Sequence, residues 1–258
     1  MNFLNTTSPV KLPKHDRTAW LKGGTARCRM PARVPKEKPL RLVLLGAPGA
    51  GKGTQAEMLH EHFGACQLST GDVFRDAKNS GVENLSATGR AALDFMRRGA
   101  LVPDDTVLEI VTERIRCLRC SGGFLLDGFP RTVAQAEALE KLLQQENVAL
   151  DAVINYELPI GKIIARLSGR RTCAHCQAVF HITTHPAQRP GVCDHCGAKL
   201  IQREDDRPES VWVRMTAYEQ STRPLIDFYA ARKLLRAVDA TGQPPDIFHR
   251  TCQALTRA

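Results

Sequence analysis

Residues 46–54, GAPGAGKGT, decide how this 258-residue chain begins its fold. The stretch follows the apolar run 42–45, which predicts a buried strand, and a helical pattern starts directly after it. Glycines let main-chain N–H groups approach phosphate oxygens, and a helix N-terminus adds the positive end of its dipole. Lys52 supplies a mobile positive charge, and the hydroxyl of Thr54 can support Mg²⁺. The stretch therefore predicts a phosphate-binding loop for a nucleoside triphosphate, although Gly53 interrupts the general Gly-Lys-Ser/Thr form.

Short apolar runs alternate with helical patterns from residue 40 onward. The strand-sized runs lie at 42–45, 124–126, 152–158 and 236–238. The helical patterns lie at roughly 104–118, 132–146 and 208–232. Strands that alternate with helices imply a parallel sheet covered on both faces, so we expect a three-layer α/β fold. Residues 169–206 break the rhythm and predict a small insertion with its own means of staying folded.

Positive charge is concentrated at the N-terminal end of the chain. The formal net charge is +9, and residues 1–40 hold nine basic residues against Asp16 and Glu37, so the remainder is near neutral. The high net charge therefore gives no argument that the folded body binds nucleic acid. Residues 1–39 lack hydrophobic periodicity, which predicts a disordered basic extension. A true start at Met30 and a targeting peptide are alternative explanations of this extension.

The composition favours a soluble globular protein. Hydrophobic residues make up 43% of the chain and charged residues 24%. No apolar run approaches the roughly 18–20 residues that a membrane-spanning helix needs. The N-terminus has no apolar secretory segment, so we expect a reducing, cytoplasmic location and no membrane partner.

Four of the nine cysteines form the pattern C-x2-C-x16-C-x2-C, namely Cys173, Cys176, Cys193 and Cys196. This spacing is typical of a zinc ribbon, in which four thiolates complete a tetrahedron around Zn²⁺. All four positions are filled by protein, so the site is expected to be structural and to fold a lid that has no large core. A redox pair and a nucleic-acid-binding zinc module are the competing interpretations.

The remaining cysteines and the histidines give weaker signals. Cys117-x2-Cys120 falls at the end of a helical pattern with no second pair nearby in sequence, so we interpret it as incidental. Cys66 and Cys252 are predicted to be buried or inert. We assign no catalytic role to any of the eight histidines.

Three further segments place hydroxyl, carboxylate and guanidinium groups near predicted strand ends. Residues 69–75, STGDVFR, put a hydroxyl and an arginine within about one helical turn. Residues 124–132, FLLDGFPRT, end a buried strand in Asp127, which suits the water shell of Mg²⁺, and continue to Arg131. Residues 203–206, REDD, followed by Arg214 give two more arginines beside acids.

In this order and spacing, GxPGxGKGT, STGDxxR, FLLDGFPRTxxQ and QRxDD resemble the adenylate kinase family. The resemblance runs from about Leu40 to about Pro245. It implies a P-loop fold with a central parallel sheet in residues 40–258. The core would comprise residues 40–68, 103–168 and 207–258, with a helical AMP-binding insertion at 69–102 and a small zinc-ribbon lid at 169–206.

The resemblance also implies roles for individual residues. The ATP site would comprise Gly49, Ala50, Gly51, Lys52, Gly53, Thr54, Arg166, Arg170, Val179, Phe180 and Gly242. The AMP site would comprise Thr70, Arg75, Ala100, Leu101, Val102, Gly128, Phe129, Pro130, Arg131, Gln135, Arg203 and Arg214. The catalytic set would be Lys52, Asp127, Arg131, Arg170, Arg203 and Arg214. A one-residue shift in the alignment would replace Gly242 by Gln243 as the backbone contact to adenine.

The expected activity is reversible phosphoryl transfer from ATP to AMP, giving two ADP, with Mg²⁺ on the nucleotide and structural Zn²⁺ in the lid. The acceptor phosphate is already ionised, so the chemistry needs charge neutralisation and alignment rather than a base. We expect a monomer that serves adenine nucleotide homeostasis and has no nucleic-acid partner. A UMP/CMP kinase is the alternative within the class, disfavoured by the long lid and by Gln135. A zinc-ribbon nucleic-acid-binding protein on a kinase-like core is the alternative from another class.

Overall fold

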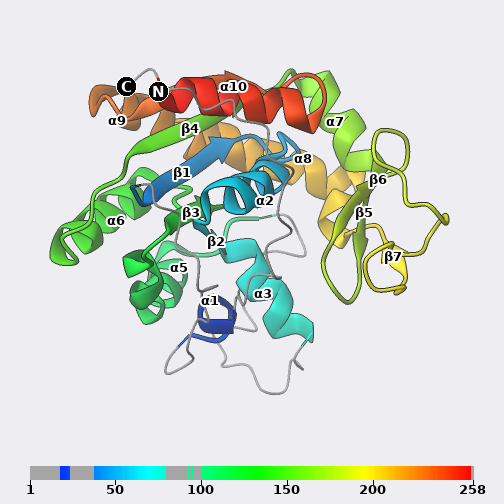
Figure 1. The fold of residues 1–258 in the computed structure, drawn as a ribbon, viewed down its shortest axis with the longest axis horizontal. Coiled ribbons are helices and arrows are strands. Elements are labelled where there is room, and N and C mark those ends of the chain that lie inside the picture. Colours follow the sequence, from blue (N-terminus) through cyan, green and yellow to red (C-terminus); the bar gives the residue numbers. More distant parts are fainter. Residues whose placement is uncertain (1–17, 24–37, 80–91, 93–94, 96–99, 257–258) are drawn as a thin grey trace.

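A computed structural model describes residues 18–23, 38–79, 92, 95 and 100–256. Within these residues, five parallel strands form the main sheet. Their spatial order is β2 (Cys66–Ser69), β3 (Gly123–Asp127), β1 (Leu40–Gly46), β4 (Ala152–Glu157) and β8 (Leu235–Asp239) (Figure 1). The expected α/β fold is confirmed.

Helices cover both faces of this sheet and make three layers. Along β1, Val43 and Leu45 belong to one buried cluster, whereas Leu42 and Leu44 belong to another, because successive side chains of a strand point to opposite faces. The first cluster is completed by α3 (Thr70–Asn79), α5 (Asp104–Glu113), α6 (Val133–Gln145) and α9 (Leu225–Ala231). The second is completed by α2 (Lys52–Phe63) and α10 (Pro244–Thr256). A sheet covered on both sides needs apolar runs without alternation, which is what the sequence has.

The four predicted strands are present as β1, β3, β4 and β8, but the sequence analysis missed β2, whose four residues carry little pattern. The helical pattern at 104–118 is α-helical only in α5 and continues as a 3₁₀ turn, η2 (Ile115–Arg119). The pattern at 208–232 divides into α8 (Pro208–Ala217), a π-type turn η4 (Tyr218–Thr222) and α9. The break before α9 falls at Pro224, which has no N–H for the helical ladder. No helix in the described part of the chain is both long and apolar enough to cross a membrane.

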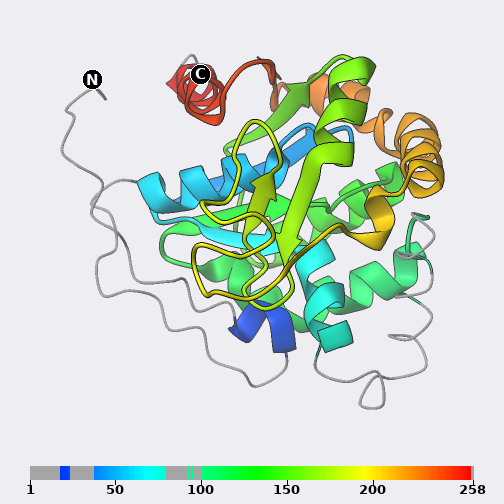
Figure 2. The ribbon, with the colours of Figure 1, turned by 90° about the vertical axis from the view of Figure 1, so that its right-hand side faces the viewer.

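The insertion at 169–206 folds as a separate small sheet beside the main one. It follows α7 (Ile160–Gly169) and contains β5 (Arg170–Cys173), β6 (Val179–His181) and β7 (Leu200–Ile201). These strands are antiparallel, with β5 in the centre, and Figure 2 views them face on. Phe180 and Leu200 form the small apolar core of this lid together with cysteine side chains.

The segment before residue 40 departs from the sequence analysis. The prediction of disorder over residues 1–39 is wrong for α1 (Thr18–Lys22), a short helix that packs against α3 (Figures 1 and 2). Trp20 is only 2% exposed and belongs to the same buried cluster as Val73 and Leu118. A large aromatic side chain buries much apolar surface and helps to anchor this short helix, but a single residue leaves no periodic pattern in the sequence. Residues 1–17 and 24–37 lie outside the described residues.

We predict that Gly123→Ala destabilises the fold strongly, by at least about 3 kcal/mol in the free energy of unfolding. Gly123 begins β3 with φ of 88°, and an added Cβ would lie 2.1 Å from the carbonyl oxygen of Leu40 on the neighbouring strand. Neither backbone can move without breaking the pairing of β1 with β3. Urea unfolding followed by circular dichroism measures the change.

The matched control is Gly161→Ala in α7, where an added Cβ meets no atom within 4 Å. Alanine is a better helix former than glycine, so this variant should be more stable by about 0.5–1 kcal/mol. Equal stabilities of the two variants would contradict the proposed strand clash.

Candidate active site

The loop at residues 46–54 joins β1 to α2 in the geometry that phosphate binding requires. Gly46, Gly49 and Gly51 have φ of 135°, 81° and 97°, conformations that favour glycine. Gly51 caps the N-terminus of α2, so the first N–H groups of that helix face the loop. The Nζ atom of Lys52 donates hydrogen bonds to the carbonyl oxygens of Gly46 at 2.7 Å and Ala47 at 3.1 Å. The loop is therefore wrapped around its own lysine.

The ammonium of Lys52 is buried among other charges. Burial lowers the pKa of Lys52 to about 8; Asp127 opposes this shift, and Arg131, Arg214 and Arg170 add to it. Four of the other predicted catalytic residues, Asp127, Arg131, Arg170 and Arg214, therefore lie within electrostatic range of Lys52. A buried cation with an excess of positive neighbours is stabilised by an anion, and phosphate is the anion that this loop geometry suits.

Arg166 connects the loop to the C-terminal part of the chain. Its guanidinium donates to the carbonyl oxygens of Ala50 at 3.2 Å, Ala240 at 2.8 Å and Gly242 at 3.2 Å. Burial lowers the pKa of Arg166. The structure thus brings three of the predicted ATP-site elements together: the loop, Arg166 and the turn at Gly242.

Besides the phosphate loop, the structure has a pocket beside the end of β3, where AMP binding is predicted. We call it the second pocket, the loop being the first binding surface. Its lining residues are Thr70, Gly71, Phe74, Val102, Val107, Gly128, Arg131 and Gln135. The Thr70 hydroxyl donates to the carbonyl oxygen of Gly128 at 3.0 Å, and the Nε of Arg131 donates to the same oxygen at 2.8 Å. Both groups are thereby fixed at the pocket wall.

The other residues predicted for AMP differ in how they relate to this pocket. Arg75 is ion-paired with Asp72, and a Cβ added to Gly71 would lie 3.0 Å from the Arg75 guanidinium. Ala100 and Leu101 precede Val102 but are not among the described lining residues. Phe129 and Pro130 are buried behind Gly128 and joined by a cis peptide bond.

Asp104 is a site residue that the sequence analysis missed. Its carboxylate accepts hydrogen bonds from the Gln135 amide at 2.6 Å and from the Thr132 hydroxyl at 2.8 Å. Gln135 in turn accepts a hydrogen bond from the backbone N–H of Arg131 at 2.7 Å. Asp104 thus fixes the orientation of Gln135 at the pocket. Its sequence signal was only a pair of acids in the first turn of a helix, which commonly means stabilisation of the helix dipole.

Four arginines surround the space between the loop and the pocket, and the lid supplies two of them. Arg170 pairs with both carboxylate oxygens of Asp206, whose side chain is fully buried. Arg214 donates to Asp205 at 3.1 Å and to Asp206 at 3.3 Å. Arg203 donates to the hydroxyl of Thr172 at 2.9 Å. The acids hold the guanidinium groups of Arg170 and Arg214 in fixed positions and neutralise only part of the charge of the cluster.

The pKa values reflect this crowding of positive charge. Burial, together with Arg170 and Arg75, lowers the pKa of Arg203. Burial and the neighbouring Arg214 likewise lower the pKa of Arg131. Although burial opposes ionisation of Asp205, Arg214 and the other arginines bring its pKa below the usual range. The arrangement can bind several ionised oxygens at once.

Two residues predicted for ATP lie in the lid. Val179 is exposed on β6, whereas Phe180 is only 3% exposed. The buried Phe180 ring stacks on the exposed His185 ring of the lid, with ring centroids 5.5 Å apart. The side chain of Phe180 is therefore part of the lid core, and its backbone is the part that can contact a ligand.

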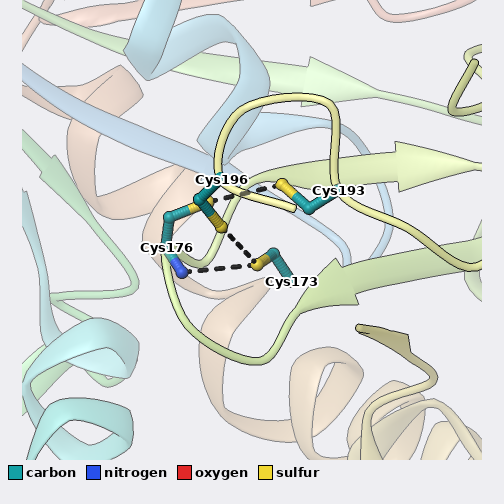
Figure 3. Close-up of side chains that lie close together, drawn as sticks. All are labelled: Cys173, Cys176, Cys193 and Cys196. Atoms are coloured by element: carbon teal, nitrogen blue, oxygen red, sulfur yellow. Dashed lines mark hydrogen bonds between the residues drawn. The ribbon is translucent and has the colours of Figure 1, made fainter. Parts of the chain in front are cut away.

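The four lid cysteines converge in the described structure (Figure 3). The Sγ atoms of Cys173 and Cys196 are 3.4 Å apart, those of Cys176 and Cys193 are 3.5 Å apart, and all four lie within 4.8 Å of one another. A tetrahedral zinc ion with Zn–S bonds of about 2.3 Å requires sulfur separations of about 3.8 Å. Burial by itself would raise the pKa of the Cys173 thiol, but hydrogen bonds from the backbone N–H groups of Cys176 and His175 outweigh this effect and lower the pKa to about 6. The four side chains fit a thiolate metal site.

The other cysteines form a different arrangement. Cys66 is buried, as predicted, and its Sγ lies 2.8 Å from that of Cys120. Cys117 is also buried and Cys252 partly so. In the described part of the chain, only the lid cysteines form a group of three or more side chains that could hold a metal.

Comparison with known proteins agrees with this geometry. The family model for adenylate kinase matches residues 44–234. Proteins named adenylate kinase from Caldicellulosiruptor bescii and Thermodesulfovibrio yellowstonii are 52% and 45% identical over 204 and 218 residues. These alignments cover 79% and 84% of this chain and 92% and 100% of the relatives. The adenylate kinase of Archaeoglobus fulgidus is 46% identical over 202 residues, which cover 78% of this chain and 91% of that protein. The glycine loop, the adjoining pocket and the arginines between them, together with these relatives, show that the chain belongs to the adenylate kinase family.

Proposed function

We propose that the chain transfers the terminal phosphoryl group of Mg²⁺-bound ATP to AMP, reversibly, giving two ADP. The observation that carries the proposal is that Lys52 of the loop and Arg131 of the pocket wall lie within electrostatic range of each other. Two phosphate-binding surfaces that meet at one cluster of cations suit a donor and an acceptor held end to end. Family membership supports phosphoryl transfer between adenine nucleotides.

The proposed division of the site follows the contacts described above. The loop and Lys52 hold the ATP phosphates, while Arg166 and the turn at Gly242 border the adenosine. Thr70, Arg75 and Gln135 hold AMP in the adjoining pocket.

The residues of the chain would act by alignment and electrostatics. The attacking oxygen belongs to a phosphate that is already ionised, so no side chain has to remove a proton. Arg131, Arg170, Arg203 and Arg214 neutralise the oxygens of the transferring group, and each is charged at neutral pH and able to bind two oxygens.

Two metal ions belong to the proposal. Asp127 lies beside the loop, since a Cβ added to Gly53 would be 3.5 Å from its carboxylate. Its oxygens, with the hydroxyl of Thr54, suit a hard cation, and Mg²⁺ would supply charge neutralisation on the ATP phosphates. Zn²⁺ would bind Cys173, Cys176, Cys193 and Cys196 and hold the lid that carries Arg170 and Arg203 in position. A monomeric state, a cytoplasmic location and a role in adenine nucleotide balance complete the proposal.

The substrate assignment is tested by a coupled assay of ADP formation with AMP, CMP, UMP and GMP as acceptors. We expect turnover with AMP to exceed turnover with each other acceptor by at least about tenfold, because Gln135 is fixed to face the pocket. Lys52→Met should lower kcat by about 10²–10³-fold, the usual effect of removing one preorganised charge at a phosphoryl-transfer site. Lys141→Met, on the exposed face of α6, is the matched control and should retain full activity. Turnover with UMP or CMP but not AMP would overturn the assignment.

The lowered pKa of Lys52 predicts a proton linkage to ATP binding. In the protein without nucleotide, the charged form of Lys52 is lost as the pH rises through about 8. A bound triphosphate favours the charged form and raises this pKa, so binding about one pH unit above that value should take up as much as about one proton per ATP. Below pH 7 Lys52 is already charged and should contribute no uptake. Isothermal titration calorimetry in buffers with different ionisation enthalpies measures the proton count, and uptake that persists in Lys52→Met would assign it elsewhere.

The zinc proposal is tested by metal analysis and limited proteolysis of the full chain. We expect about one zinc per chain, and Cys176→Ser should lose it, since three thiolates hold the ion far more weakly than four. Without its metal the lid has little core to keep it folded, so trypsin should cut after Lys199, which Leu200 follows, at least about tenfold faster. Cys252→Ser, at a cysteine outside the lid, is the control and should keep the metal. A zinc-free protein with an unchanged melting temperature and unchanged cleavage would refute the structural role.

A further inference from the structure

The short helix α1 lies outside the residues that the family model matches, yet it packs behind side chains that line the second pocket. The family match begins at residue 44, whereas α1 ends at Lys22. α1 packs against α3, the helix that carries Thr70 and Arg75 (Figures 1 and 2). Ala19 and Trp20 join the same buried cluster as Phe74 and Val107, and those two side chains line the pocket. The packing thus connects α1 to the wall of the pocket through shared core residues.

Trp20 makes a specific contact at the end of β2. Its indole N–H donates a hydrogen bond to the carbonyl oxygen of Ser69 at 2.9 Å. The carbonyl of Ser69 belongs to the peptide unit that also carries the N–H of Thr70. Fixing this oxygen fixes the plane of that peptide, and with it the direction from which the Thr70 hydroxyl reaches Gly128.

Arg114 secures the other side of α1. Its side chain is only 6% exposed and donates to the carbonyl oxygens of Trp20 and, at 3.1 Å, of Leu21. Its other partners are the carbonyl oxygen of Ile110 and the carboxylate of Glu113, both at 2.9 Å. A buried guanidinium that loses two acceptors is costly, so α1 and Arg114 stabilise each other.

Arg114 immediately follows α5, and Val107 of the same helix lines the pocket. α1 is therefore held between two of the elements that line the pocket: the β2–α3 connection through Trp20, and α5 through Arg114. Gly23 ends the helix, with its N–H bonded to the carbonyl oxygen of Ala19 at 3.0 Å. Its φ is 63°, and an added Cβ would lie 3.0 Å from the Arg114 guanidinium. Both the helix end and the arginine are thus closely fitted.

We propose that Trp20 is a positioning residue of the AMP site, which holds Thr70 and the pocket wall in the arrangement that binds the acceptor nucleotide. This inference rests on the proposed function, because it takes the second pocket to be the AMP site. Trp20 does not line that pocket, so its effect passes through Ser69 and α5. It should act on the acceptor nucleotide alone, because α1 contacts neither the loop nor Arg166 in the described hydrogen bonds and core clusters.

The test compares kinetic constants for the two nucleotides in full-length variants. Trp20→Phe keeps most of the packing and removes the N–H, so it should raise the KM for AMP by about twofold to fivefold, the upper value being the factor that one whole neutral hydrogen bond gives. Trp20→Ala should raise it about tenfold or more. In both variants the KM for ATP and the kcat should stay within about twofold of the parent protein. The matched control is Trp212→Phe, at an exposed tryptophan that is 73% accessible, which should leave the KM for AMP unchanged.

Different failures have different meanings. A lower melting temperature with an unchanged KM for AMP would make α1 a stabilising segment and overturn the inference. An equal rise of both KM values would overturn the acceptor-specific role. If the parent protein fails to phosphorylate AMP at all, it is the proposed function that fails, because that result does not involve Trp20.

A second measurement protects the test against misfolding of the alanine variant. The chain has two tryptophans, so Trp20 is the only one left in Trp212→Phe, and its fluorescence reports on α1. The emission should be blue-shifted relative to the urea-unfolded protein, since Trp20 is buried. In the Trp212→Phe background, Arg114→Met should shift the emission of Trp20 towards the unfolded value. Arg114→Met should also raise the KM for AMP, and the double variant with Trp20→Phe should raise this KM by less than the product of the two single-variant factors. Emission of an exposed tryptophan in folded Trp212→Phe, or full multiplicativity of the two variants, would overturn the inference.

Discussion

The active site depends on an excess of buried positive charge. Lys52 lies within electrostatic range of Arg131, Arg170 and Arg214, Arg203 lies within range of Arg170, and fewer acids lie among them. Burial, and after it their mutual repulsion, lowers the pKa values of several of these groups. The repulsion would push the groups apart if Asp206 and Asp205 did not hold two of the guanidinium groups in place. The acids set the geometry without cancelling the charge. The remaining positive charge attracts polyanions, and the groups that carry it are held in place before a nucleotide binds. Preorganised charge of this kind is the form of electrostatic stabilisation that favours phosphoryl transfer most.

The parallel sheet explains why these groups converge. The loop that ends in Lys52 leaves the end of β1, Asp127 ends β3, and Thr70 follows the end of β2. In a parallel sheet the carboxyl ends of all strands reach the same edge, so groups far apart in sequence are delivered to one place. Arg170 and Arg203 come from the lid and Arg214 comes from α8, all three outside the sheet. The carboxyl edge of the sheet therefore places Lys52, Asp127 and Thr70, and the lid and α8 add the arginines that face them.

Two small segments depend on something other than a large hydrophobic core. The lid has four buried core residues, two of them cysteines, and its four thiols have the arrangement that a metal needs. α1 has five residues, far too few for an isolated helix to be stable in water, and it depends on Trp20 and on carbonyl groups bonded to Arg114. The lid and α1 are each stabilised by a small, specific set of side-chain interactions. Each also lies against residues that we assign to nucleotide binding, so its local order and the binding properties of the site are connected.

The sequence by itself determined the phosphate loop, four of the strands, the fold class and the four lid cysteines. These features depend on local physics: glycines at fixed offsets from a lysine, continuous apolar runs, and cysteine pairs whose spacing suits one tetrahedral ion. The sequence did not reveal β2, because four residues are too few for a periodic pattern, and it predicted one long helix where the π-type turn η4 and Pro224 separate α8 from α9.

Only the tertiary structure decided which partners fix the site residues. Asp104 orients Gln135 from 31 positions away, and Asp206 holds Arg170 from 36 positions away. The docking of Trp20 on Ser69 spans 49 positions and lies in a segment that the composition marked as disordered. None of these pairs has a spacing rule, because each depends on how separate elements pack against one another and not on the chain between them. The chemistry of this protein was therefore readable from its motifs, whereas the rigidity that makes the chemistry effective comes from contacts that only the folded chain creates.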